Sequence, residues 1–180
     1  MTDLAVRYRV STRRSAELLV GAWLIGVFAW ILVDSSTGQT SLGGWTALIS
    51  AGVLMLAAHF FVRWQVPYAD PILFPTVAAL NMLGLVMIHR LDIAASQRAA
   101  ANGLQAPTPD VYLQITWMTL GLIAFIGVVT VLRDHRALQR VTWTAGVAGV
   151  ALLFLPMLPF IGAEVNGARL WVRVMGLSFQ

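Results

Sequence analysis

Apolar stretches of about twenty residues alternate with short polar connections along most of the chain. Five windows without Asp, Glu, Lys or Arg cover residues 18–33, 42–62, 71–88, 111–132 and 141–163. A helix that crosses the hydrocarbon core needs roughly 17–25 apolar residues, so four windows are long enough and the first is at the lower limit. None alternates polar and apolar residues as barrel strands do. The pattern predicts an all-α, polytopic membrane protein with about five transmembrane helices.

The composition excludes a soluble domain and several kinds of site. Charged residues make up 11% of the chain and apolar residues 58%, whereas a soluble domain carries about 25% charged residues. The chain has no cysteine, which excludes disulfides and thiolate metal sites. Its three histidines, His59, His89 and His135, lack metal-ligand spacing, so we expect no metal site in the protein.

The distribution of arginines predicts the orientation in the membrane. All the basic residues are arginine, and the formal net charge is +4. Eight arginines fall on the side of the N-terminus and four on the other side, so the positive-inside rule predicts a cytoplasmic N-terminus and an outside C-terminus. Basic charge in such a protein mainly sets topology, and we infer no nucleic-acid partner from it. The basic N-terminus followed by the first window is expected to act as a retained signal anchor.

The predicted spans contain few polar groups that could do chemistry. His59 lies about one turn from Arg63 and is expected to reach the membrane interface. Asn81 is near mid-membrane and is expected to bond a neighbouring helix. Ionisable groups inside a membrane mark proton and ion paths, so their scarcity argues against proton-coupled transport.

The last nineteen residues carry the most informative polar pattern. In a strand, Arg169, Trp171 and Arg173 fall on one face; in a helix, the two arginines are i and i+4 neighbours. Either conformation places two guanidinium groups beside an indole at the predicted outer surface. One interpretation is a site for an anionic headgroup such as a pyrophosphate. A generic interfacial amphipathic segment explains the same pattern equally well.

Residues 166–173 and 178–180 resemble the Asn-Gly-Ala-x-x-Trp loop and following Phe-Gln of the SEDS proteins, the FtsW/RodA/SpoVE family. Residues 67–71, 84–92 and 134–136 are similar to actinobacterial members of the elongation-type RodA branch. The resemblance implies that residues 1–66 form a basic tail and two accessory transmembrane helices. Residues 67–180 would then hold the first three transmembrane helices and first large motif loop of a truncated family core.

The same resemblance implies a function. Family members are peptidoglycan glycosyltransferases of the bacterial cytoplasmic membrane that polymerise lipid II in cell-wall synthesis, cell shape and cell division, together with a class B penicillin-binding protein. The catalytic acid of the family lies in a later loop, so we assign no catalytic residue here and expect the 180-residue chain alone to be inactive. No cofactor is implied, although a divalent cation could accompany the substrate. The residues expected at the lipid II headgroup are Asn166, Arg169, Trp171, Arg173 and Gln180.

Two other functions are compatible with a multi-span protein. A translocase for lipid-linked precursors needs a hydrated polar path, which the predicted spans scarcely provide. A non-catalytic membrane scaffold that recruits cell-wall enzymes would need no such path.

Overall fold

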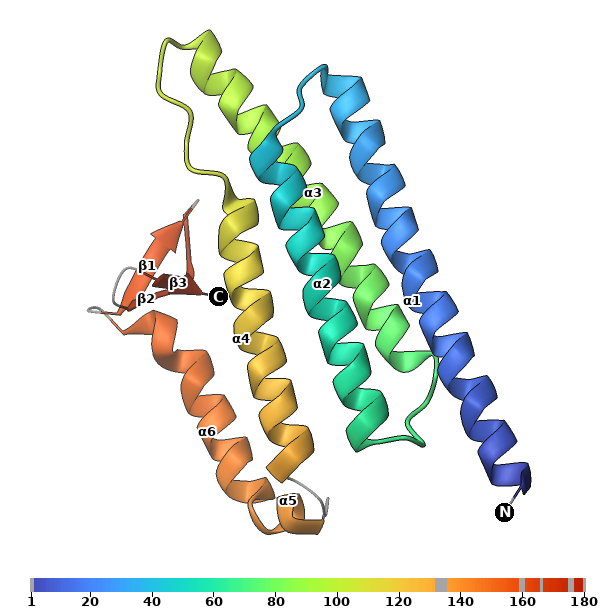
Figure 1. The fold of residues 1–180 in the computed structure, drawn as a ribbon. Helices are drawn as coiled ribbons and strands as arrows, with labels where there is room; N and C mark the ends of the chain where they lie inside the picture. Colours follow the sequence, from blue (N-terminus) through green and yellow to red (C-terminus); the bar gives the residue numbers. More distant parts are fainter. Residues whose placement is uncertain (1, 132–135, 159–160, 166, 175–176, 180) are drawn as a thin grey trace. The chain divides into compact units, whose positions relative to one another are not determined.

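The computed structural model describes residues 2–131, 136–158, 161–165, 167–174 and 177–179, in two compact units (Figure 1). The first unit comprises Met1–Val131 and the second Leu132–Gln180. Each unit is described separately below.

The first unit consists of four long helices. They are α1 (Thr2–Thr37), α2 (Leu42–Gln65), α3 (Leu73–Ala101) and α4 (Asp110–Val131). Each contains a segment long and apolar enough to cross a membrane; in α1 this segment is Arg13–Thr37, with 25 residues. The first four sequence windows are therefore confirmed as helices, and the first helix is longer than its window because the residues on both sides of the window, including Asp34, are helical.

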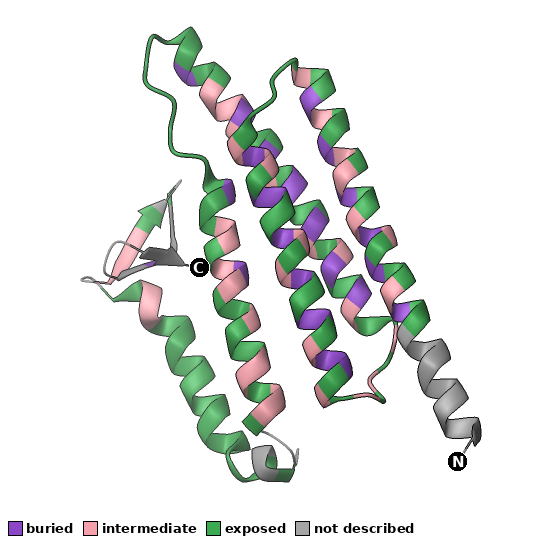
Figure 2. Ribbon diagram, in the orientation of Figure 1, coloured by how far each residue is buried: buried purple, intermediate pink, exposed green. Residues whose placement is uncertain are grey.

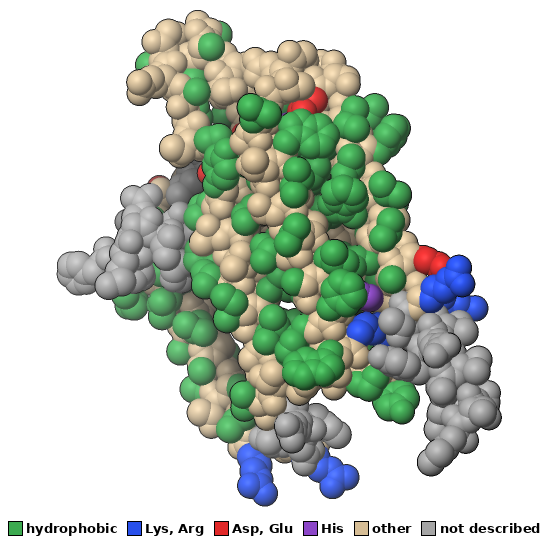
Figure 3. Space-filling view, viewed as in Figure 1, with side chains coloured by type: hydrophobic (Ala, Val, Ile, Leu, Met, Phe, Trp, Pro, Cys, Tyr) green, Lys and Arg blue, Asp and Glu red, His purple; other side chains and the backbone are tan. Residues whose placement is uncertain are grey.

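The helices of the first unit pack through a narrow core. α1 lies along α3 with the same direction, and α2 runs the opposite way (Figure 1). Small residues such as Ala47, Ala51 and Ala78 are buried where helices approach, as expected when close van der Waals packing holds membrane helices together. The outward faces are exposed and largely apolar (Figures 2 and 3). Such surfaces suit lipid rather than water.

Polar groups define the ends of several helices. The Ser41 hydroxyl oxygen accepts a hydrogen bond from the Gly44 N–H at 3.0 Å and so caps α2. α3 ends at Ala101 with Asn102 as its cap residue, and the Leu104 N–H reaches back to the Ala99 carbonyl at 2.8 Å. Gly103 has a φ of +68°, the left-handed conformation that glycine adopts at low cost at the end of a helix.

Both polar residues singled out within the spans differ from their expected roles. His59 is buried, at 3% exposure, and its ring lies near those of Phe60 and Phe74 rather than at the interface. The Asn81 amide donates to the Val77 carbonyl of its own helix at 2.9 Å, so it does not need the neighbouring helix that the sequence suggested.

The second unit contains shorter elements. They are α5 (Arg136–Arg140), α6 (Thr142–Phe154), the 3₁₀ turn η1 (Leu155–Met157), and strands β1 (Gly162–Val165), β2 (Ala168–Val174) and β3 (Leu177–Phe179). The fifth window thus forms a 13-residue α-helix, only about 20 Å long at 1.5 Å per residue. Pro156 lies in η1, directly beyond the α-helix, where its missing N–H and its ring favour an end to the helix. Of the described residues, four helices reach spanning length and this fifth is shorter, which leaves the prediction of a polytopic helical membrane protein confirmed.

Candidate functional site

The segment that carries the candidate site residues is an antiparallel three-stranded sheet. β1 pairs with β2 and β2 with β3. Val165 pairs with Ala168, so two residues, Asn-Gly in sequence, connect β1 to β2. Gly167 has a φ of +80°, as the tight turns of such hairpins require. The Asn-Gly pair is therefore a hairpin signal, whatever further role it has.

Of the two conformations that the sequence left open for this segment, the structure has the strand. Trp171 is half-buried in β2 opposite Ala163, and its neighbour Val172 is buried at 4% exposure. Arg169 and Arg173 occupy alternate positions of β2 with Trp171 between them, while their side chains lie outside the described part of the structure. Asn166 and Gln180 lie outside the described residues altogether. The hairpin thus carries three of the five candidate residues on one strand.

A second polar arrangement, which the sequence reasoning missed, lies inside the first unit. The His89 Nε2 atom is 2.8 Å from Asp34 Oδ1, and the Trp45 indole nitrogen donates to Asp34 Oδ2 at 3.1 Å. The Trp30 ring stacks on the His89 ring with centroids 3.8 Å apart. Asp34, His89 and Trp30 are each no more than 5% exposed. We call these four residues the Asp34–His89 cluster.

The position of this cluster follows from the parallel course of α1 and α3. Asp34 directly follows the first apolar window and His89 directly follows the third. Because α1 and α3 run side by side in the same direction, both polar residues reach the same level. A count of apolar residues ends the predicted span before each of them. The available signal was that an ionisable residue directly follows the apolar run in each of the two spans.

Asp92 extends the polar region from α3 to α4. It lies one turn after His89, and its two carboxylate oxygens accept hydrogen bonds from the backbone N–H groups of Asp110 and Val111 at 2.9 and 3.0 Å. These are among the N–H groups that a helix leaves unsatisfied at its start. A cavity of about 290 Å³ lies nearby, and its polar lining includes Ser41, Ser96, Tyr112, His89 and Asp92.

The polar groups inside the first unit hold its helices to one another. A carboxylate that accepts bonds from an imidazole and an indole on two other helices ties three helices together. Within the described part of the chain, no three His, Cys, Asp or Glu side chains gather closely enough to hold a metal ion. We therefore assign the Asp34–His89 cluster to the architecture and retain the hairpin as the candidate site.

Four membrane-spanning helices and a hairpin with two arginines around a tryptophan define a polytopic membrane protein with a candidate headgroup-binding strand. Residues 71–180 match the FtsW/RodA/SpoVE family model, described as cell cycle protein. The chain belongs to this family.

Curated relatives extend the similarity to nearly the whole chain. It is 39% identical over 98% of its length to the peptidoglycan glycosyltransferase RodA of Mycobacterium tuberculosis (strain ATCC 25618 / H37Rv), covering 38% of that protein. It is also 39% identical over 94% of its length to RodA of Mycobacterium leprae (strain TN), covering 35%. The probable peptidoglycan glycosyltransferase FtsW of Methylococcus capsulatus is 30% identical over 63% of the chain, with 27% of that protein covered.

The chain thus spans less than two fifths of the length of the RodA proteins that it matches. No solved structure was found to match it. The RodA similarity includes the first two helices, which precede the residues matched by the family model.

Proposed function

We propose that this chain is the N-terminal part of a lipid II polymerase, a peptidoglycan glycosyltransferase that serves cell-wall synthesis, cell shape and cell division. The observation that carries the proposal is the 39% identity with mycobacterial RodA proteins along 98% of the chain. These relatives are named peptidoglycan glycosyltransferases, and the helices of the first unit suit a substrate that resides in a membrane.

The protein would reside in the bacterial cytoplasmic membrane with its N-terminus inside. Eight of the twelve arginines lie in the N-terminal tail and in the connections expected on the same side. The positive-inside rule makes that side cytoplasmic. The hairpin would then face outward, where a lipid-linked precursor carries its pyrophosphate and sugars after translocation. A class B penicillin-binding protein would cross-link the polymer and is the proposed protein partner.

The hairpin would bind the headgroup of lipid II through Arg169 and Arg173. Guanidinium groups bind phosphate oxygens through paired, charge-assisted hydrogen bonds. The strand conformation of β2 supports the proposal, because residues two apart in a strand project to the same side. Trp171, between them, would supply an aromatic surface at the membrane interface. Asn166 and Gln180 remain candidates.

The test uses the full-length polymerase that contains this segment, reconstituted in liposomes with lipid II. Arg169→Ala and Arg173→Ala are each expected to weaken lipid II binding about ten-fold or more, since a hydrogen bond to a charged group contributes about 1.5–3 kcal/mol. The matched control is Arg98→Ala, which removes an exposed arginine from the end of α3, on the same predicted side of the membrane.

Binding and polymerisation separate the two parts of the proposal. Loss of lipid II binding in the hairpin variants, with Arg98→Ala unaffected, supports the headgroup role. Unchanged binding in both hairpin variants overturns that role even if the protein polymerises lipid II. The wild-type protein is also assayed in the presence of its penicillin-binding partner. If it then translocates lipid II but does not polymerise it, the glycosyltransferase function itself is overturned.

A further inference from the structure

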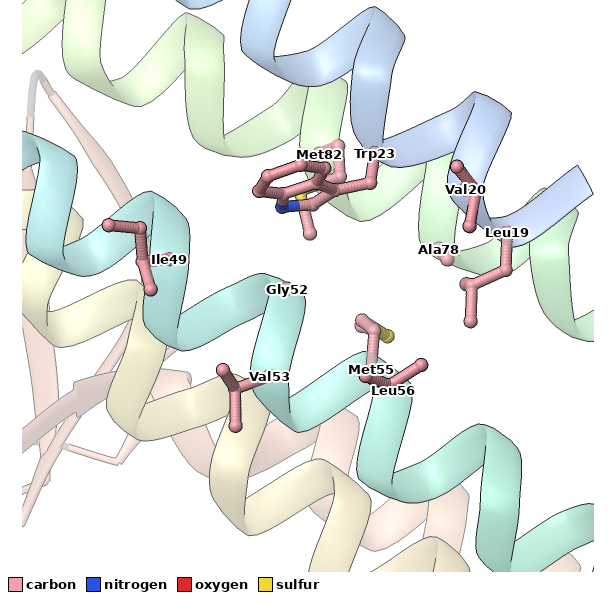
Figure 4. Close-up of a pocket in the computed structure, with 10 residues that line it drawn as sticks. All are labelled: Leu19, Val20, Trp23, Ile49, Gly52, Val53, Met55, Leu56, Ala78 and Met82. Carbon is pink, nitrogen blue, oxygen red and sulfur yellow. The ribbon is translucent and has the colours of Figure 1, made fainter. Parts of the chain in front are cut away.

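An apolar groove opens between α1 and α2, with α3 as its floor (Figure 4). Its volume is about 240 Å³. Every residue along it is apolar: Leu19, Val20, Trp23, Ile49, Gly52, Val53, Met55, Leu56, Ala78 and Met82.

The groove exists because α1 rests on α3 rather than along the whole of α2. Trp23 of α1 packs against Gly52 of α2 at one point, and the small side chain of Ala78 leaves space on the side of α3. Val20 and Val53 are 53% and 60% exposed, so the groove is open to the membrane. An apolar groove at this depth contacts lipid chains, since water finds no hydrogen-bond partners there.

The dimensions of the groove favour a single hydrocarbon chain over a helix as its occupant. From Ile49 to Leu56 the groove follows α2 for about 10 Å, at 1.5 Å per residue. A volume of about 240 Å³ along this length is narrow for a helix, whose diameter with side chains is about 10–12 Å. An extended hydrocarbon chain fits such a channel, and a helix does not.

Positive charge lies beyond one end of the groove on both of its walls. Arg13 precedes Val20 by seven residues in α1, and Arg63 follows Leu56 by seven residues in α2. Residues seven apart share a helix face, and two turns cover about 10 Å. Because α1 and α2 run in opposite directions, both arginines lie at the same end of the unit. Figure 3 shows basic side chains at this end, beside a face covered with hydrophobic ones.

Among the described residues, the acidic groups near Arg13 leave its charge available to an anion. Glu17 pairs with Arg13 at 2.9 Å, but both side chains are well exposed, at 61% and 84%. Such an exposed i,i+4 pair contributes little and can exchange partners. The Asp70 carboxylate accepts a hydrogen bond from the Ile72 backbone N–H at 2.7 Å. Arg63 is buried, donates to the Ala69 carbonyl and has a further interaction within the protein, so Arg13 is the arginine that a ligand can reach.

We propose that this groove binds one acyl chain of an anionic phospholipid, whose phosphate lies against Arg13 with Arg63 close behind it. The proposal concerns a structural lipid and is independent of the polymerase reaction. The apolar walls select a hydrocarbon chain, and Arg13 selects the negative headgroup over a zwitterionic one. The bound lipid fills the gap that α1 and α2 leave between them.

The test compares phosphatidylglycerol with phosphatidylcholine of the same acyl chains, added to the purified full chain in detergent and counted by native mass spectrometry. Phosphatidylglycerol is expected to bind about five-fold more tightly, since one basic residue near an anionic lipid contributes about that factor. Val53→Trp fills the groove and is expected to abolish retention of the tightly bound lipid. Its matched control, Leu80→Trp, adds an indole at an equally exposed position of α3 outside the groove.

Two charge changes give effects of opposite sign. Arg13→Gln should weaken the binding of phosphatidylglycerol about five-fold and leave the binding of phosphatidylcholine unchanged. Glu17→Gln should strengthen the binding of phosphatidylglycerol, because it frees Arg13 from its ion pair. Arg90→Gln, at an exposed position near the opposite end of α3, is the control. Equal binding of the two lipids, or equal effects of Val53→Trp and Leu80→Trp, overturns the proposal. If Val53→Trp does not fold, the variants of the exposed pair Arg13 and Glu17 still test the proposal. Phosphatidylglycerol binding that changes in the same direction in both variants contradicts it.

Discussion

Replacement of Asp34 by alanine is the most informative perturbation of the first unit. The side chain is 5% exposed and accepts hydrogen bonds from two buried donors, His89 Nε2 at 2.8 Å and Trp45 Nε1 at 3.1 Å. Asp34→Ala leaves both donors without their acceptor. Hydrogen bonds to a charged group contribute about 1.5–3 kcal/mol each, so the two bonds together predict a loss of about 3–6 kcal/mol.

A lower limit comes from other membrane proteins. Interhelical hydrogen bonds there average about 0.6 kcal/mol, because the unfolded helices find other partners in the membrane. Two such bonds amount to roughly 1.2 kcal/mol. We expect Asp34→Ala to exceed this limit, since three helices meet at one carboxylate and the stacked Trp30 ring excludes water from His89.

The assay is reversible unfolding of the full chain in mixed micelles with increasing denaturing detergent. Asp34→Asn keeps one acceptor oxygen and should lose about half as much free energy of unfolding as Asp34→Ala. Trp45→Phe removes one donor, and its cycle with Asp34→Ala isolates that bond. Ser35→Ala is the matched control, because its hydroxyl bonds only the Ile31 carbonyl of its own helix at 2.7 Å among the described contacts. A loss below about 1.2 kcal/mol for Asp34→Ala, or one equal to that of Ser35→Ala, would refute the reasoning.

Two further predictions concern the connections and packing of the first unit. Asp92→Ala removes the acceptor of the Asp110 and Val111 N–H groups and should cost about 0.5–2 kcal/mol, with faster hydrogen exchange at the start of α4; unchanged exchange there would contradict the capping role. Gly52→Ala places a methyl group against the Trp23 indole and should destabilise by about 1–3 kcal/mol. By contrast, the methyl group of Gly84→Ala meets nothing within 4 Å, so this variant should stabilise α3 by up to about 1 kcal/mol. Melting temperatures that move in the same direction in both glycine variants would contradict this contrast.

The number and course of the long helices could be predicted from hydropathy because lipid demands continuous apolar runs of a set length. The first four windows correspond to α1 to α4 for this reason. Helix ends could not be placed in the same way. Asp34 and His89 continue their helices because each finds a partner on another helix, and a charge count along one sequence window contains no information about such partners.

The fifth window shows the limit of hydropathy alone. Residues 141–163 are as apolar as the other windows, yet α6 ends at Phe154 and the chain enters a sheet at Gly162. Local backbone chemistry, with Pro156 beyond the helix, outweighs the apolar composition. For residues 169–173 the sequence left strand and helix open, and the Asn-Gly pair at 166–167 was an unused signal for the strand hairpin. What the arginines bind was not, since a headgroup site and an interfacial segment have the same pattern.

The bond between Asp34 and His89 also restricts how the protein adapts to its bilayer. Insertion of one residue in α1 would raise Asp34 by about 1.5 Å and rotate it by about 100°, away from His89. α1 therefore cannot slide along α3 to match a thinner or thicker membrane. A mismatch of thickness has to be met by tilting the four helices together or by deforming the lipid around them. The depth of α1 in the membrane is thereby coupled to that of α3, the first helix of the residues matched by the family model.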